Sequence, residues 1–224
     1  MTIVVPRGAE AAAVRRARPS SRVIEVPAGA RAATGLPTFE DDDTVVVLGL
    51  CGALHGGSVG DVVVYRRVVD DGASYQLDAG VRDALASSLG ANVVAACTAN
   101  HVVTTLAERS ALASRYNATV VDMEGTHLAA ALATRGVRLA MVRIVSDDDS
   151  CDLPALERAI GADGSIDVVR IATAFVRSPR AAYAFIRNVR HALRRLTEIA
   201  PVVIRGSPFD FAQADDGGSS TGSE

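Results

Sequence analysis

Short apolar runs recur along the first two thirds of the chain, and most are continuous rather than alternating. They are Ile3–Val5, Val23–Val26, Thr44–Leu50, Val62–Tyr65, Val93–Cys97, Thr119–Val121 and Leu139–Val145. The runs have the length of strands and are rich in β-branched residues, and an unbroken apolar run is typical of a strand buried on both faces. The pattern therefore predicts a mostly parallel sheet that is covered on both sides.

Helical patterns lie between and after these runs, at Glu10–Ala17, Val81–Leu89, Leu106–Tyr116, Thr126–Thr134, Asp167–Arg177 and Pro179–Ile199. Alternation of strand and helix predicts an α/β protein with a mixed, mostly parallel central sheet and helices on both faces, in three layers. We expect a single domain over residues 1–205. Residues 206–224 are rich in Gly, Ser and Asp and predict a disordered tail.

Composition narrows the possible functions. The 224 residues are 49% hydrophobic with a net charge of −3, which suits one globular domain and gives no basic excess for nucleic acid. No apolar run approaches the roughly 20 residues of a membrane span. All basic residues are Arg, so a Schiff-base or phosphate-loop lysine is impossible. Cys51, Cys97 and Cys151 show no CxxC spacing, which favours a reducing cytoplasm without a disulfide framework or cysteine zinc site.

A glycine-rich segment, Gly49–Asp61, follows the run that ends at Leu50. Its spacing is not GxGxxG, and a new strand begins at Val62 where a crossover helix would be needed, so a dinucleotide site is disfavoured. Two interpretations stay open. The segment is either a tight structural turn or a surface where the main chain at Cys51 and Gly52 contacts a small polar ligand.

Acidic residues stand at the ends of two predicted strands. Glu124 follows Asp122 and Met123 where a strand gives way to a helix, and it is either a capping acid or part of a site. Ser146 and Asp147 end the strand that starts at Leu139. Because ligands of open α/β sheets bind at the carboxyl ends of strands, these acids mark either a solvated turn or a site.

Arg143 lies inside that last apolar run. An unpaired buried guanidinium would be costly, so we expect it to meet a carboxylate in the core, with Asp122 and Glu124 as candidates.

Three segments, in this order and spacing, resemble the nucleoside phosphorylase/nucleosidase superfamily. They are Gly49–Leu54 with the following Val59–Val64, then Asp122–Glu124, then Val142–Asp147. The resemblance is closest to the 5′-methylthioadenosine/S-adenosylhomocysteine nucleosidases, and it implies a nucleoside phosphorylase-like α/β/α fold. It also implies cleavage of the N-glycosidic bond of a purine nucleoside.

The resemblance assigns chemical roles to individual residues. Asp147 would be the general acid on the leaving base and must hold a proton near neutral pH, through burial or neighbours such as Asp148. Glu124 would bind the ribose hydroxyls, and Glu10 would activate water. The sugar would pass through an oxocarbenium-like state.

Further residues of the implied site surround the substrate. Met123 would pack under the sugar, and Ser146, Cys51 and Gly52 belong to the motifs that carry the resemblance. His101 and Val102 stand where the family usually has a base-stacking aromatic residue.

Other functions stay open. A phosphorylase would use the same acids with phosphate as co-substrate, for which Arg7 and Arg31 are possible donors. A non-catalytic nucleoside-binding protein is a second alternative. The third is a membrane- or partner-binding module using the arginine-rich helix after Pro179, with Arg180, Arg187, Arg190, His191, Arg194 and Arg195, although such a charge run is usually a solvated helix face. By resemblance we expect a homodimer. The cysteine pattern favours the cytoplasm, and because the sequence carries no metal-cluster or redox-cofactor signature we expect neither cofactor.

Overall fold

The computed structural model describes residues 1–17, 22–148 and 179–205. Their strands are β1 Thr2–Pro6, β2 Arg22–Val26, β3 Thr44–Ala53, β4 Val62–Val69, β5 Ser74–Gln76, β6 Asn92–Thr98, β7 Val120–Asp122 and β8 Arg138–Asp147. Their helices are α1 Ala9–Arg16, the 3₁₀ helix η1 Gly29–Gly35, α2 Ala79–Leu89, α3 Leu106–Tyr116, α4 Gly125–Ala133 and α7 Pro179–Arg205. The predicted helix at Asp167–Arg177 and the predicted tail lie outside the described residues.

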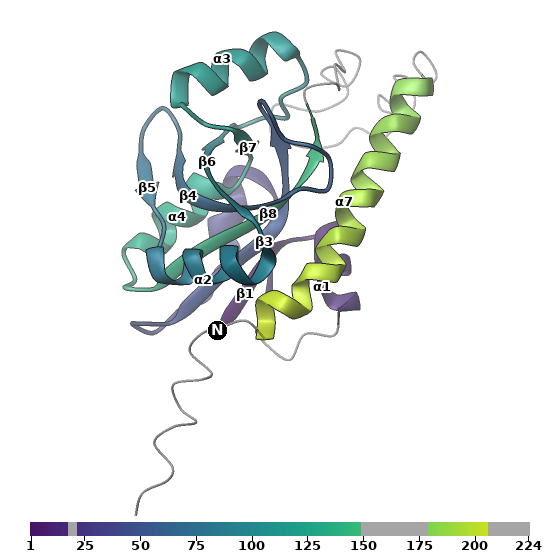
Figure 1. The fold of residues 1–224 in the computed structure, drawn as a ribbon. Coiled ribbons are helices and arrows are strands. Elements are labelled where there is room, and N and C mark those ends of the chain that lie inside the picture. The colour runs from purple at the N-terminus through teal and green to yellow at the C-terminus, as the bar shows by residue number, and fades with distance from the viewer. Residues whose placement is uncertain (18–21, 149–178, 206–224) are drawn as a thin grey trace, which may run out of the picture.

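The strands form one mixed sheet in which parallel pairing predominates, as predicted (Figure 1). Part of this sheet closes on itself. β3 pairs with β8, β8 with β4, β4 with β6, β6 with β7, and β7 with the end of β3. β1 and β2 extend the sheet beyond β3, and β5 extends it beyond β4. The ring brings the carboxyl ends of β3, β6, β7 and β8 to the same place, and these ends carry the predicted site.

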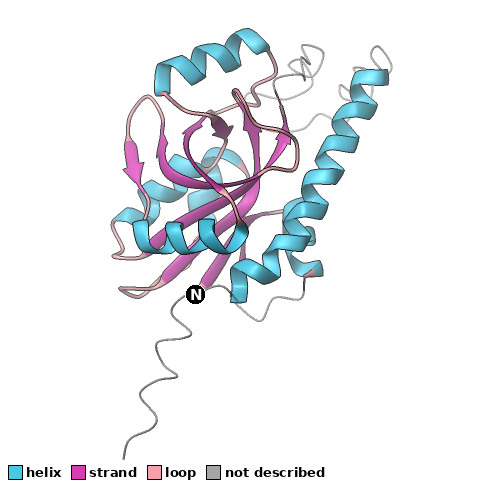
Figure 2. Cartoon of the chain, viewed as in Figure 1, coloured by secondary structure: helices cyan, strands magenta, loops and turns pink. Residues whose placement is uncertain are grey.

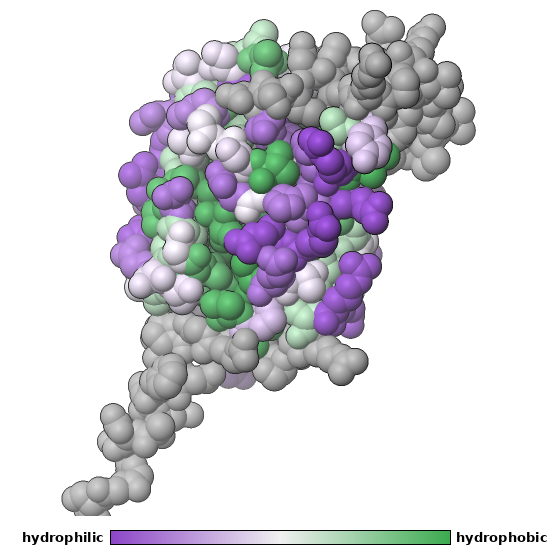
Figure 3. Space-filling view, turned by 45° about the vertical axis from the view of Figure 1, so that its right-hand side comes forward, coloured by the Kyte–Doolittle hydropathy of each residue, from purple (hydrophilic) through white to green (hydrophobic). Residues whose placement is uncertain are grey.

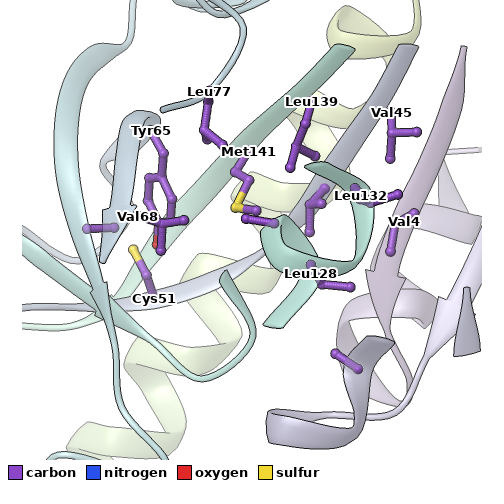
Figure 4. Packing of buried hydrophobic residues seen from close by; sticks show 14 of the residues in the cluster. Val4, Val45, Cys51, Tyr65, Val68, Leu77, Leu128, Leu132, Leu139 and Met141 are labelled. Carbon is purple, nitrogen blue, oxygen red and sulfur yellow. The ribbon is translucent and has the colours of Figure 1, made fainter. Parts of the chain in front are cut away.

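Helices cover both faces of the sheet (Figure 2). On one face, α1, α2 and α7 pack against the strands through a cluster that includes Val14, Leu85 and Leu196. On the other, α4 contributes Leu128 and Leu132 to a second cluster with residues of β1, β3, β4 and β8 (Figure 4). The arrangement confirms the predicted three-layer α/β/α architecture of a single domain. Most residues of β1, β3 and β8 are buried whichever way they point, which explains the continuous apolar runs.

The strand β3 is longer than the apolar run predicts, because it continues through Cys51 and Gly52 to Ala53. The pairing of β3 with β8 shifts register there. Cys51 pairs with Val145 and Gly52 with Asp147, which leaves Ser146 as the extra residue of a β-bulge. A bulge redirects the side chains that follow it. Gly52 also pairs with Val121 of β7, so the strands that carry the two acidic motifs flank this one glycine.

The helix α7 extends beyond its predicted end at Ile199 and passes through Pro201 to Arg205. Its inner face places Ala192, Leu196, Ile199, Ala200, Val203 and Ile204 in the core. This burial stabilises the last turn although Pro201 cannot donate a helical hydrogen bond.

The opposite face of α7 is polar. Arg187, Arg190 and Arg194 are exposed, and the side of the molecule that carries this helix presents many hydrophilic residues (Figure 3). The arginines therefore occupy the solvent face of a helix that packs on the sheet. Across the described ranges, no helix combines the length and hydropathy needed to cross a bilayer.

Candidate active site

Arg143 lies at the centre of the candidate site and is fully buried. Its Nη2 is 3.2 Å from Oδ2 of Asp122 and 3.6 Å from Oε2 of Glu124, so the structure confirms that this strand arginine meets both expected carboxylates. Burial alone would lower the pKa of Arg143, but the carboxylates of Asp122 and Glu124 raise it, and Glu10 adds to the rise. Nε and Nη1 of Arg143 have no hydrogen-bond partner among the described residues.

Asp122 is fixed by donors from three elements. Oδ1 accepts hydrogen bonds from the hydroxyl of Thr98 at 2.9 Å and from the main-chain N–H of Gly125 at 3.0 Å, while Oδ2 faces Arg143. Asp122 therefore accepts a hydrogen bond from the first residue of α4 and forms an ion pair with Arg143. This saturation makes Asp122 a structural partner of the site rather than a group free to react.

Glu124 stands at the N-cap of α4, but its side chain makes no capping hydrogen bond. Its Oε1 instead accepts the N–H of Gly29 at 2.8 Å, across 95 residues of sequence. Burial raises the pKa of Glu124, Arg143 opposes the rise and Asp122 adds to it. The carboxylate therefore contacts the start of η1 and a cation, which disfavours the capping interpretation. Gly29 has a φ of 68°, a conformation that favours glycine.

Glu10, on the first turn of α1, reaches the same cluster from the N-terminal part of the chain. Its Oε1 accepts the N–H of Leu50 at 2.7 Å. Burial of the carboxyl group raises the pKa of Glu10 from 4.5 to about 7, with Arg143 opposing this rise and Glu124 adding to it.

Gly49 provides the space in which these groups approach each other. A Cβ at this position would lie 2.1 Å from Nη1 of Arg143 and 2.8 Å from Oε1 of Glu10. Both groups therefore pack against the main chain of Gly49, and only glycine fits there.

Asp147 follows the bulge at Ser146, and its side chain is 19% exposed. The hydroxyl of Ser146 lies 2.8 Å from Oδ1 of Asp147 and 3.2 Å from the carbonyl oxygen of Cys51. A hydroxyl has one proton and two lone pairs. Ser146 can therefore donate to an ionised Asp147, or donate to the carbonyl and accept from a protonated Asp147, so it suits both states of a general acid.

Arg109 of α3 also holds Asp147. Its Nη2 pairs with Oδ2 of Asp147 and lies 3.2 Å from the carbonyl oxygen of Val103, and its Nη1 bonds to the carbonyl oxygen of Ala53. The side chain of Arg109 is only 3% exposed. The charged group in contact with Asp147 is therefore a cation, whereas we expected acidic neighbours such as Asp148.

The remaining predicted residues differ in how deeply they are buried. Met123 is partly buried, and a Cβ at Gly29 would lie 3.8 Å from its Cε. Cys51 is buried. Val102 is partly buried, whereas the side chain of His101 is 53% exposed and its Nε2 lies 2.6 Å from Oε1 of Glu108.

Comparison with known families decides the relationship. The phosphorylase superfamily matches residues 27–178, which include Glu124 and Asp147 and start after Glu10. The chain belongs to the phosphorylase superfamily. Comparison with curated protein sequences gives no match.

Solved structures of related enzymes share the superfamily fold. Apo 5′-methylthioadenosine nucleosidase from Arabidopsis thaliana matches with a TM-score of 0.65 and 17% identity over 93% of this chain and 97% of its own. Futalosine hydrolase from Helicobacter pylori gives 0.64 and 12% over 91% and 96%. The 5′-methylthioadenosine/S-adenosylhomocysteine nucleosidase from S. pneumoniae, with a transition-state inhibitor, gives 0.63 and 17% over 92% and 99%. At these identities the likeness concerns the fold.

Two residues of the site, Gly29 and Arg109, were missed by sequence reasoning. Gly29 lies in an Ala- and Gly-rich stretch with no apolar run, and nothing local connects it to Glu124. Arg109 does carry a signal. Leu112, Ala113 and Tyr116 pack inward from α3, and Arg109 precedes them at helical spacing, so an arginine on that inner face needs a buried acid.

Proposed function

We propose that this member of the superfamily hydrolyses the N-glycosidic bond of a purine nucleoside, such as 5′-methylthioadenosine, S-adenosylhomocysteine or a related compound. The observation that carries the proposal is the meeting of Glu10 and Glu124 around Arg143. These two carboxyl groups come from widely separated segments, α1 and the start of α4, and both have raised pKa values. Perturbed acids gathered at the carboxyl ends of strands are typical of a catalytic site.

Glu10 is the proposed general base. With a pKa of about 7, it is ionised in a large fraction of molecules near neutral pH and still basic enough to accept a proton from water. Water then adds to C1′ of the ribose, its proton passes to Glu10, and the electrons of the C1′–N9 bond leave with the base. Asp147 supplies the proton that the departing base takes at N7, which leaves a neutral free base and a free sugar.

Glu124 is the proposed ribose ligand. Its carboxylate has about four lone-pair positions, and Gly29 and Arg143 occupy only part of this capacity. The negative charge of Glu124 and Asp122 also suits the positive charge that develops on the sugar in the transition state.

A phosphorylase is the second candidate, because Nε and Nη1 of Arg143 lack partners among the described residues and could donate to a phosphate oxygen. Two observations favour water. Arg143 already faces three acids, which would repel a phosphate dianion. The other proposed phosphate donors, Arg7 and Arg31, are exposed.

The test is an assay of free base by chromatography after incubation with 5′-methylthioadenosine, S-adenosylhomocysteine, adenosine and inosine, each with and without phosphate. Base release without phosphate is expected. Release that requires phosphate would make the protein a phosphorylase and would remove the role of Glu10. Nucleoside binding without release from any of these compounds would favour the non-catalytic alternative.

By resemblance, we propose further that the protein acts as a cytoplasmic homodimer on a small-molecule nucleoside, without a metal or redox cofactor.

A further inference from the structure

Arg109 occupies a position where an apolar residue would satisfy the packing of α3. Its helix turns Leu112, Ala113 and Tyr116 toward a small core with Cys97 and Val121. A buried guanidinium is stable only when its donors are engaged and its charge is matched, and replacement of a buried ion pair by apolar side chains is often neutral or stabilising. Packing alone therefore does not account for an arginine here.

The partners of Arg109 belong to three parts of the candidate site. Asp147 ends β8, Ala53 ends β3, and Val103 lies in the loop that also carries His101 and Val102. One side chain thus joins the proposed general acid to the loop where the family usually has its base-stacking residue. A shift of Arg109 would change the spacing between the two groups that are proposed to contact the base.

Both oxygens of the Asp147 carboxyl group have a side-chain partner, and one face of the group packs against the main chain. Ser146 lies 2.8 Å from Oδ1, and Arg109 pairs with Oδ2. A Cβ at Gly52 would lie 3.0 Å from Oδ2, so the carboxyl group also packs closely against the main chain of β3. Of these contacts, the one with Arg109 is the only ionic one among the described residues.

We propose that Arg109 is a positioning residue that orients the Asp147 carboxyl toward the base of the nucleoside. The proposal rests on the proposed function, because it assigns Arg109 a part in that same cleavage. With Oδ2 held by Arg109 and Oδ1 held by Ser146, the plane of the carboxyl group is fixed before the base binds.

The test compares kcat and KM for base release in the wild type, Arg109→Met and Arg109→Lys. Loss of orientation should lower kcat by roughly ten- to a hundredfold in Arg109→Met, because small misplacements of a catalytic group have effects of this size. KM should stay near its wild-type value, since the orientation of the acid acts in the transition state and not in substrate binding. Arg109→Lys retains the charge without the planar fork, so kcat should fall in this variant as well.

Arg115→Met is the matched control, since Arg115 lies on the same helix, is 62% exposed and pairs with the surface residue Asp71. It should leave both kcat and KM unchanged. An unchanged kcat in Arg109→Met, or a loss of kcat that only matches a loss of folded protein by circular dichroism, would show a merely structural role and overturn the proposal. If Arg109→Met does not fold, wild-type kcat in Arg109→Lys would overturn it instead.

The two proposals can fail separately. Base release by the wild type with an unchanged kcat in Arg109→Met would remove the role of Arg109 and leave the proposed function intact. No base release by the wild type would overturn the proposed function and the role of Arg109 with it.

Discussion

At the scale of single residues, the candidate site is built around a cation that lies among acids. Arg143 is fully buried, and its charge offsets those of Asp122, Glu124 and Glu10. Removing one partner of a buried ionic cluster leaves uncompensated charge in a poorly solvated place, which costs more than the cluster contributes when intact.

We therefore expect Arg143→Met to lower the free energy of unfolding by about 3–5 kcal/mol. Urea denaturation followed by circular dichroism measures this change. Arg115→Met provides the exposed counterpart and should change stability by less than about 1 kcal/mol. A variant at Arg143 that is as stable as the wild type would mean that the acids do not need its charge.

Glu10 links stability to pH. Its pKa is 4.5 in an unfolded chain and about 7 in the fold, so the folded state retains a proton that the unfolded state has lost in this interval. The contribution of Glu10 to stability is therefore present in full below pH 4.5 and is lost as the pH rises to about 7.

The variant Glu10→Gln stays neutral at every pH. We expect its thermal midpoint to exceed that of the wild type at pH 8 and to approach it at pH 4.5, while base release is lost. Calorimetric scans at the two values measure the difference, with the exposed Glu40→Gln as control. If the thermal midpoints of the variant and the wild type differ by the same amount at both pH values, ionisation of the buried Glu10 carboxyl is not what lowers the stability of the wild type.

At the scale of elements, the end of β3 determines how closely the acidic motifs approach each other. Gly52 pairs with Asp147 on one side and with Val121 on the other, and a Cβ there would lie 3.0 Å from Oδ2 of Asp147. Asp147 cannot easily move away, because Arg109 and Ser146 hold its two oxygens.

We accordingly expect Gly52→Ala to reduce kcat/KM for base release by roughly tenfold or more and to cost only about 1–3 kcal/mol of stability. Steady-state kinetics together with urea denaturation separate the two effects. In Gly80→Ala the added Cβ would lie 3.5 Å from Asp78, an ordinary contact, so activity and stability should not fall. Full activity in Gly52→Ala would contradict the placement of Asp147 against β3.

The helix α7 is a structural element of the domain, and its arginine face does not by itself indicate binding. Leu196 is fully buried on its inner face, whereas Ile186 is 44% exposed. Leu196→Ala should therefore destabilise the protein by about 2–5 kcal/mol. Ile186→Ala should have little effect, and both are measured by urea denaturation. Equal, small effects would mean that α7 is not packed on the sheet as described.

At the scale of the whole molecule, the layers could be predicted from the sequence but the closure of the sheet could not. Buried strands such as β1 and β8 are largely apolar runs, and such runs can be recognised from the local sequence. The end of β3 contains Gly49 and Gly52, which interrupt the apolar pattern typical of a strand. The edge strand β5, Ser74–Gln76, is short and has no apolar run. The antiparallel pairing of β7 with β3 depends only on tertiary structure.

The site could be predicted in part for the same reason. Glu124, Ser146 and Asp147 follow strands, so their position in the fold could be inferred from the chain. The contact of Arg143 with carboxylates also follows from the cost of burying its charge. The contacts of Gly29 with Glu124 and of Arg109 with Asp147 join distant segments, and only the folded chain brings them together.

Release of free base from 5′-methylthioadenosine in phosphate-free buffer is the decisive measurement for the proposed hydrolysis. We expect release by the wild type and by the surface variant Glu198→Gln. Asp147→Asn should release at least a hundredfold less, because general acid catalysis contributes about 10²–10⁴-fold. Equal release by Asp147→Asn and the wild type would contradict the assignment of Asp147 as the general acid.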